Sequence, residues 1–165
     1  MNEEYDDLQK EIIRQAKARA LKILEFSDKT EKQLRDKLKE GEFPPFAVDE
    51  AIEYVRGFHY IDDLRYAEAY IRGRRSRKST YELRMELRQK GLDPDTIETA
   101  LVNEPPDEEN TLKELFLKKY GRKDLSDPKT YEKAFRYFAA KGYGFDDIKK
   151  AISSAVEGQE DSFDS

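Results

Sequence analysis

Apolar positions along the chain fall into three copies of one pattern. The anchors of the pattern are Leu38, Leu87 and Phe138, which lie 49 and 51 residues apart. Five further columns agree at fixed distances from the anchors: Leu34, Leu83 and Ala134; Phe43, Leu92 and Tyr143; Val48, Ile97 and Ile148; Ala51, Ala100 and Ala151; Ile52, Leu101 and Ile152. We therefore predict three copies of one supersecondary unit, because tandem units bury each other's apolar faces.

Each copy carries the signals of a helix at its centre. Residues 30–33 and 79–82 match the capping box, in which a Ser or Thr and a Gln or Glu three residues later cap each other's backbone amides. The third copy has Asp127 followed by Pro128, an N-cap and a proline at the first helical position. We expect these middle helices to end at glycines in the C′ position, namely Gly41, Gly91 and Gly142.

A further helix is expected on each side of the middle one. Apolar residues at helical spacing over residues 13–24, 64–71 and 112–120 predict the preceding helices, and no strand pattern is evident. The predicted fold class is all-α: three tandem three-helix repeats forming an elongated, curved array. The predicted boundaries are an acidic tail at 1–9, repeats at 10–58, 59–104 and 105–156, and an acidic tail at 157–165.

The composition limits the class of protein. Charged residues make up 41% of the 165 residues, against a usual share of about 25%. There is no cysteine, no apolar run long enough to span a membrane, and no apolar segment in the acidic N-terminal sequence that would act as a secretory signal. We expect a soluble, cytoplasmic protein that is a monomer and does not contact a membrane.

The net charge of −5 conceals a strong segregation of sign. Residues 72–90 carry +6 and the remainder of the chain −11. The main basic cluster consists of Arg72, Arg74, Arg75, Arg77, Lys78, Arg84, Arg88 and Lys90, and the second basic cluster of Lys118, Lys119, Arg122 and Lys123. Such segregation is typical of a surface that meets nucleic acid or an acidic protein. The alternative is an ordinary solvated face in a highly charged chain.

No catalytic centre, metal site or cofactor site is predicted. His59 is the only histidine and the chain has no cysteine, so neither a pair of histidines nor a cysteine–histidine pair can form. Asp62 and Asp63 precede a strong helix pattern, where acidic residues serve as N-caps and complement the helix dipole. We therefore expect a protein that is not an enzyme.

Two segments resemble a known family. Residues 58–67 read FHYIDDLRYA and resemble the G-Y-I/L-D/N-D-x-R-F/Y-A signature of the RecX regulatory proteins. Residues 82–92 resemble the I-x-x-E-L-x-x-K-G-I segment of that family. His59 stands where the signature has glycine, and residues 78–80 stand where many members have a Gly-Pro turn. The signature residues expected to have a structural role between the first two repeats are Tyr60, Asp62, Asp63, Arg65, Tyr66 and Ala67.

The resemblance implies a function. RecX proteins modulate, and usually inhibit, the bacterial recombinase RecA, and they lie in the groove of the filament that RecA forms on single-stranded DNA. The resemblance thus implies a non-enzymatic regulator of DNA recombination, DNA repair and the SOS response. Its partners would be the RecA filament and, through the filament, single-stranded DNA, with both basic clusters as contact surface. Two alternatives are an autonomous nucleic-acid-binding module and a repeat scaffold for another protein.

Overall fold

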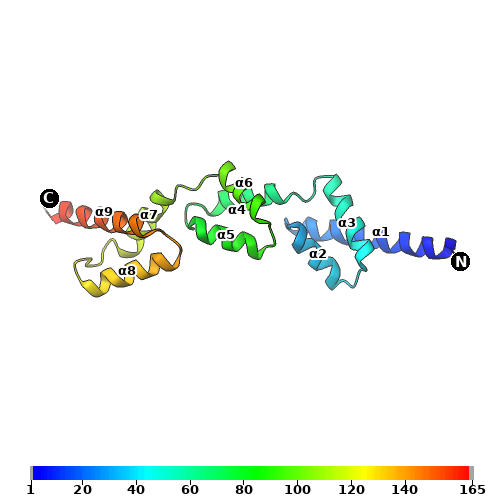
Figure 1. Ribbon diagram of the computed structural model, residues 1–165, viewed down its shortest axis with the longest axis horizontal. Helices are drawn as coiled ribbons and strands as arrows, with labels where there is room; N and C mark the ends of the chain where they lie inside the picture. Colours follow the sequence, from blue (N-terminus) through cyan, green and yellow to red (C-terminus); the bar gives the residue numbers. More distant parts are fainter. Residues whose placement is uncertain (1, 164–165) are drawn as a thin grey trace. The chain divides into compact units, whose positions relative to one another are not determined.

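The computed structural model describes residues 2–163, and this range contains nine helices and no strand. The helices are α1 (Asn2–Phe26), α2 (Glu31–Glu40), α3 (Pro45–Gly57), α4 (Asp63–Arg74), α5 (Thr80–Gln89), α6 (Pro94–Asn103), α7 (Glu108–Tyr120), α8 (Pro128–Ala140) and α9 (Phe145–Phe163). Figure 1 labels them in chain order. We refer to α1–α3, α4–α6 and α7–α9 as repeats 1, 2 and 3. The predicted all-α class is confirmed.

Both acidic ends are helical over the described residues. Helix α1 begins at Asn2, and Glu3 and Glu4 lie in its first turn, where negative charge complements the helix dipole. Helix α9 continues to Phe163. The side-chain amide of Gln159 donates hydrogen bonds to the carbonyls of Gly121 and Lys123 and so holds this end of α9 against the loop after α7.

The chain divides into two compact units. Unit 1 contains residues 1–69 and 87–100, and unit 2 contains residues 70–86 and 101–165, so repeat 2 contributes to both. The core of unit 1 includes Ala16, Ala20, Leu34, Leu38, Ala47, Val48, Ala51, Ile52, Val55 and Ile61. The core of unit 2 includes Leu112, Phe116, Tyr120, Leu125, Ala134, Phe138, Tyr143, Ile148, Ala151, Ile152 and Ala155. The apolar columns of the sequence pattern therefore supply about half of the residues named in each core.

All three middle helices end in the same turn, a Schellman motif. The backbone amide five residues after each anchor donates to the anchor's carbonyl, from Phe43, Leu92 and Tyr143 to Leu38, Leu87 and Phe138 at 3.2–3.3 Å. The residue before each of these donors has a positive φ: Glu42 (63°), Gly91 (87°) and Gly142 (90°). The prediction of Gly41 as the C′ residue was wrong, since its φ is −77° and it lies one position too early for this turn.

The capping boxes are confirmed in the first two middle helices. In α2 the Gln33 amide donates to Thr30 Oγ1, and the Thr30 amide donates to Gln33 Oε1, both at 3.1 Å. In α5 the Glu82 amide donates to Ser79 Oγ at 3.0 Å and the Ser79 amide donates to Glu82 Oε1 at 3.2 Å. In α8, Asp127 is the N-cap residue, but its carboxylate accepts the Thr130 hydroxyl and no backbone amide.

The same cap hydroxyls also bond to the following repeat. Thr30 Oγ1 donates to the carbonyl of Lys90 at 2.6 Å, within unit 1. Ser79 Oγ donates to the carbonyl of Lys141, within unit 2. Because Lys90 and Lys141 directly precede the positive-φ glycines, each cap meets the turn that ends the next middle helix. We call this contact a repeat joint, and each unit contains one.

A carboxylate completes each joint. The amide of Glu31, the first residue of α2, donates to Asp63 Oδ1 at 2.9 Å. The amide of Thr80, the first residue of α5, donates to Glu108 Oε1 at 3.0 Å. The two acceptors are the first residues of α4 and α7. Each donor and acceptor of the second joint therefore has an equivalent in the first joint.

Candidate functional site

The segment that resembles the family signature connects α3 to α4 in unit 1. His59 has a φ of 57°, in the left-handed region that glycine adopts most easily, which explains the glycine usual at this position. The guanidinium of Arg65 donates to the carbonyl of His59 at 2.9 Å. The carboxylate of Asp62 accepts the Arg65 amide at 3.0 Å and so caps α4, as predicted for an acidic residue at this place.

Asp63 is the carboxylate of the first joint and is crowded by like charge. Burial raises the pKa of Asp63, Asp93 and Asp62 raise it further, and Arg56 opposes them. One oxygen of the Asp63 carboxylate accepts a hydrogen bond from the Glu31 amide. Within residues 2–163 no group of three or more His, Cys, Asp or Glu side chains is arranged to hold a metal ion.

The remaining signature residues also make contacts inside the fold. Ala67 is fully buried, and Tyr66 is partly buried. Tyr60 is half exposed and stacks on Phe58, with 5.7 Å between the ring centroids. The role expected for the signature between the first two repeats stays a prediction.

Part of the main basic cluster is neutralised inside unit 2. Glu104, which lies outside the basic stretch of sequence, pairs with Arg72 at 2.5 Å and with Arg75 at 3.1 Å. Glu86 pairs with Lys78 and accepts the Tyr70 hydroxyl at 2.5 Å. Burial raises the pKa of Glu86, but these two hydrogen bonds outweigh it and leave the pKa below its ordinary value.

The other members of the main basic cluster lie in both units. Arg74 covers the ring of Tyr70, with 3.8 Å between the guanidinium carbon and the ring centroid, and Arg77 and Arg84 are exposed. These three residues belong to unit 2, whereas Arg88 and Lys90 belong to unit 1. The basic stretch of sequence is therefore not one continuous patch of a single unit.

Arg77 meets part of the second basic cluster at a pocket of unit 2. The pocket has a volume of about 290 Å³, and we call it the four-cation pocket. It is lined by Arg77, Leu115, Lys118, Lys119, Tyr137, Phe138 and Lys141. The ammonium nitrogens of Lys119 and Lys141 lie 3.8 and 5.0 Å from the centroid of the Tyr137 ring. Lys141 also lies 3.8 Å from a carboxylate oxygen of Glu82.

Sequence reasoning missed two residues of this pocket. Tyr137 lies in the last turn of α8, and Lys141, four residues later, is the residue that caps the end of that helix, so the two lie on the same side of it. That spacing of an aromatic and a basic residue was the available signal. The convergence of Lys118 and Lys119 with Arg77 is a tertiary contact that the sequence does not display.

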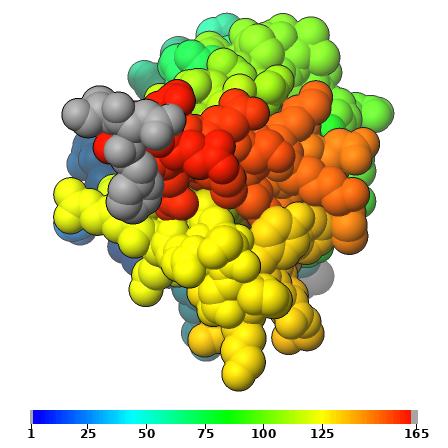
Figure 2. All heavy atoms as spheres, turned by 90° about the vertical axis from the view of Figure 1, so that its left-hand side faces the viewer, coloured from blue at the N-terminus to red at the C-terminus, as the bar shows by residue number. Residues whose placement is uncertain are grey.

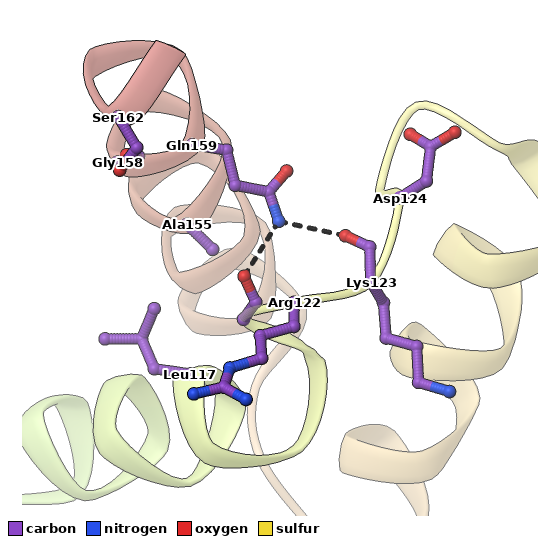
Figure 3. Close-up of a pocket in the computed structure, with 9 residues that line it drawn as sticks. Leu117, Arg122, Lys123, Asp124, Ala155, Gly158, Gln159 and Ser162 are labelled. Atoms are coloured by element: carbon purple, nitrogen blue, oxygen red, sulfur yellow. Dashed lines mark hydrogen bonds between the residues drawn. The ribbon is translucent and has the colours of Figure 1, made fainter. Parts of the chain in front are cut away.

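Arg122 and Lys123 lie at a different pocket, of about 520 Å³, between the loop after α7 and the end of α9. In Figure 3, Gln159 reaches from α9 to the carbonyls of this loop, while the side chain of Lys123 extends away from Gln159. Figure 2 shows the yellow loop beside the red end of α9. The second basic cluster is therefore divided between two pockets.

Among the described residues, no helix combines the length and the apolar character that crossing a bilayer requires.

Comparison with known proteins places the chain in a family. Models of the first, second and third three-helix domains of RecX match residues 16–54, 62–101 and 107–152. The chain is 32% identical over 152 residues to "Regulatory protein RecX" of Clostridium botulinum (strain Alaska E43 / Type E3), covering 89% of this chain and 71% of the relative. It is 34% identical over 146 residues to "Regulatory protein RecX" of Clostridium perfringens (strain 13 / Type A), covering 83% and 69%.

A solved structure agrees with these sequence matches. "Crystal structure of regulatory protein RecX" superimposes with a TM-score of 0.77 at 28% identity, covering 89% of this chain and 75% of the other. The three domain models together span most of the chain and follow the order of the three repeats. The chain therefore belongs to the RecX family of regulatory proteins.

Proposed function

We propose that this protein binds the filament of the RecA recombinase on single-stranded DNA and restrains its ATPase and strand-exchange activities in the cytoplasm. Membership of the RecX family supports the regulatory class. The observation that carries the choice of partner is the exposed positive charge of unit 2, where Arg77 of the main basic cluster meets Lys118 and Lys119 of the second. A nucleoprotein filament offers phosphates and acidic protein surface to such charges.

A regulator of this kind acts by binding and not by catalysis. The carboxylates of Asp63 and Glu108 are hydrogen-bonded to backbone amides in the repeat joints, and that of Asp62 caps α4. Their chemistry is therefore structural. Lysine and arginine side chains contact phosphates without reading sequence, so the proposed function does not require a preferred DNA sequence.

The direct test adds the purified protein to the cognate recombinase on single-stranded DNA and follows ATP hydrolysis and strand exchange. We expect both rates to fall as the protein is titrated. Unchanged ATPase, strand exchange and filament lifetime at saturating protein would refute the proposal.

A charge-reversed variant tests whether unit 2 supplies the contact. We expect Arg74→Glu with Arg77→Glu to weaken filament binding while leaving helical circular dichroism unchanged. The matched control is Lys149→Glu with Lys150→Glu, since these two lysines lie on α9 and do not line the four-cation pocket. Binding that persists undiminished in the first variant would remove this surface from the interface.

A further inference from the structure

We propose that the four-cation pocket holds the phosphodiester backbone of a single nucleic-acid strand directly, and that the Arg72 and Arg75 side of the main basic cluster does not. The inference rests on the proposed function in one respect only, because the strand in question is that of the recombinase filament. It assigns different roles to residues that the sequence places in one cluster.

The positive charge of the pocket favours the binding of an anion. Four cations come from three separate places: Arg77 from the turn after α4, Lys118 and Lys119 from α7, and Lys141 from the residue that follows α8. The contact of Lys141 with Glu82, at 3.8 Å, is longer than a hydrogen bond and offsets only one of these charges. Like charges held together in this way repel, and a bound anion relieves the repulsion.

The form of the pocket favours a nucleotide chain over an acidic peptide. Three of its four cations are lysines, which bind phosphates as compact point charges. An aromatic ring, Tyr137, lies among them and is 37% exposed. A basic groove combined with an accessible aromatic side chain is the usual arrangement in proteins that bind single strands, because it serves both the phosphate and the adjoining base.

The Arg72 side of the cluster has the opposite character. Arg72 and Arg75 share the carboxylate of Glu104, whose side chain is only 19% exposed. Their charge is therefore partly balanced within the fold. A phosphate arriving there would have to compete with a carboxylate that is already bonded to both guanidinium groups.

The experiment measures binding of a fluorescein-labelled oligothymidylate to the full chain, without recombinase, over a series of salt concentrations. The test variant is Lys118→Gln with Lys119→Gln, and the matched control is the other adjacent pair, Lys149→Gln with Lys150→Gln. For single strands each lost phosphate contact lowers the slope of log K against log[salt] by about 0.7, so we expect the test variant to lose about 1.4 and the control to keep the wild-type slope. Arg77→Gln alone should lose about 0.7.

Three results would overturn the inference: no binding of the oligonucleotide by the wild type at low ionic strength, a wild-type slope in the test variant, or an equal loss in the control. Recombinase ATPase measured with the same proteins separates the two proposals. If a pocket variant keeps the DNA affinity of the wild type and still inhibits the recombinase ATPase as the wild type does, the inference fails and the proposed function stands. If only the pocket variants lose salt dependence of DNA binding but the wild type does not change the recombinase ATPase, the proposed function fails and the assignment of the pocket stands.

Discussion

The second repeat joint requires a residue without a side chain at position 142, and the substitution Gly142→Ala tests this requirement. The φ of Gly142 is 90°, a conformation that residues with a Cβ rarely adopt. A Cβ at this position would lie 2.4 Å from Cβ and 2.5 Å from Cγ of Tyr81, near the start of α5. The Tyr81 Cβ cannot swing away without moving the helix backbone, so the substitution forces α5 away from the turn.

The expected cost is the sum of two effects. A left-handed conformation costs a residue with a side chain about 1–2 kcal/mol, and losing the bond from Ser79 Oγ to the Lys141 carbonyl adds about 0.5–1.5 kcal/mol. We therefore expect Gly142→Ala to lower the free energy of unfolding by about 1.5–3.5 kcal/mol. Urea unfolding followed by far-ultraviolet circular dichroism measures it.

The matched control is the equivalent turn of repeat 1. Glu42 occupies the same C′ position with a φ of 63° but carries a side chain. Glu42→Gly should therefore raise the free energy of unfolding by about 1 kcal/mol, opposite in sign to Gly142→Ala. If Gly142→Ala shifts stability by less than about 0.5 kcal/mol, as an ordinary surface substitution does, the joint does not depend on glycine and the reasoning fails.

Three further substitutions have definite expected outcomes. Tyr143→Phe removes a buried hydroxyl that has no hydrogen-bond partner in the described structure, so it should raise the urea midpoint, equivalent to about 1 kcal/mol; a lower midpoint would mean that the hydroxyl is bonded. His59→Gly relieves a left-handed φ and should raise the free energy of unfolding by about 1 kcal/mol; no gain would mean that the hydrogen bond from Arg65 offsets the strain. Burial raises the pKa of Asp63, so the wild type loses stability as the pH rises through that raised value. Asp63→Asn keeps an oxygen for the Glu31 amide and should be more stable than wild type at neutral pH, with a difference that disappears on acidification; a pH-independent difference would contradict this.

The helices and their starts could be predicted because their signals are local. The apolar columns repeat at helical spacing, and the capping boxes at Thr30 and Ser79 each lie within four residues of chain. The end of α2 was misplaced for the same reason: Gly41 is the nearest glycine, although the turn falls on Glu42. The fixed distance from the anchor, which Gly91 and Gly142 share with Glu42, gives the correct position.

The candidate site was harder to predict because its partners are distant in sequence. Counting charge along the chain found Arg72 and Arg75 but not Glu104, which neutralises both from about thirty residues away. The same count separated Arg77 from Lys118 and Lys119, which the fold brings to one pocket. The second bond of each cap hydroxyl was likewise invisible, since its acceptor belongs to the next repeat.

The repeat joints also make two backbone amides into natural reporters. The first amide of a helix has no acceptor within that helix and ordinarily exchanges its hydrogen with solvent quickly. In this protein the amides of Glu31 and Thr80 are held by carboxylates of the following repeat. Slow deuterium uptake at these two positions would track the integrity of one joint each, separately from the melting of α2 and α5. In each unit, hydrogen exchange at one backbone amide therefore reports whether the contact between adjacent repeats is intact.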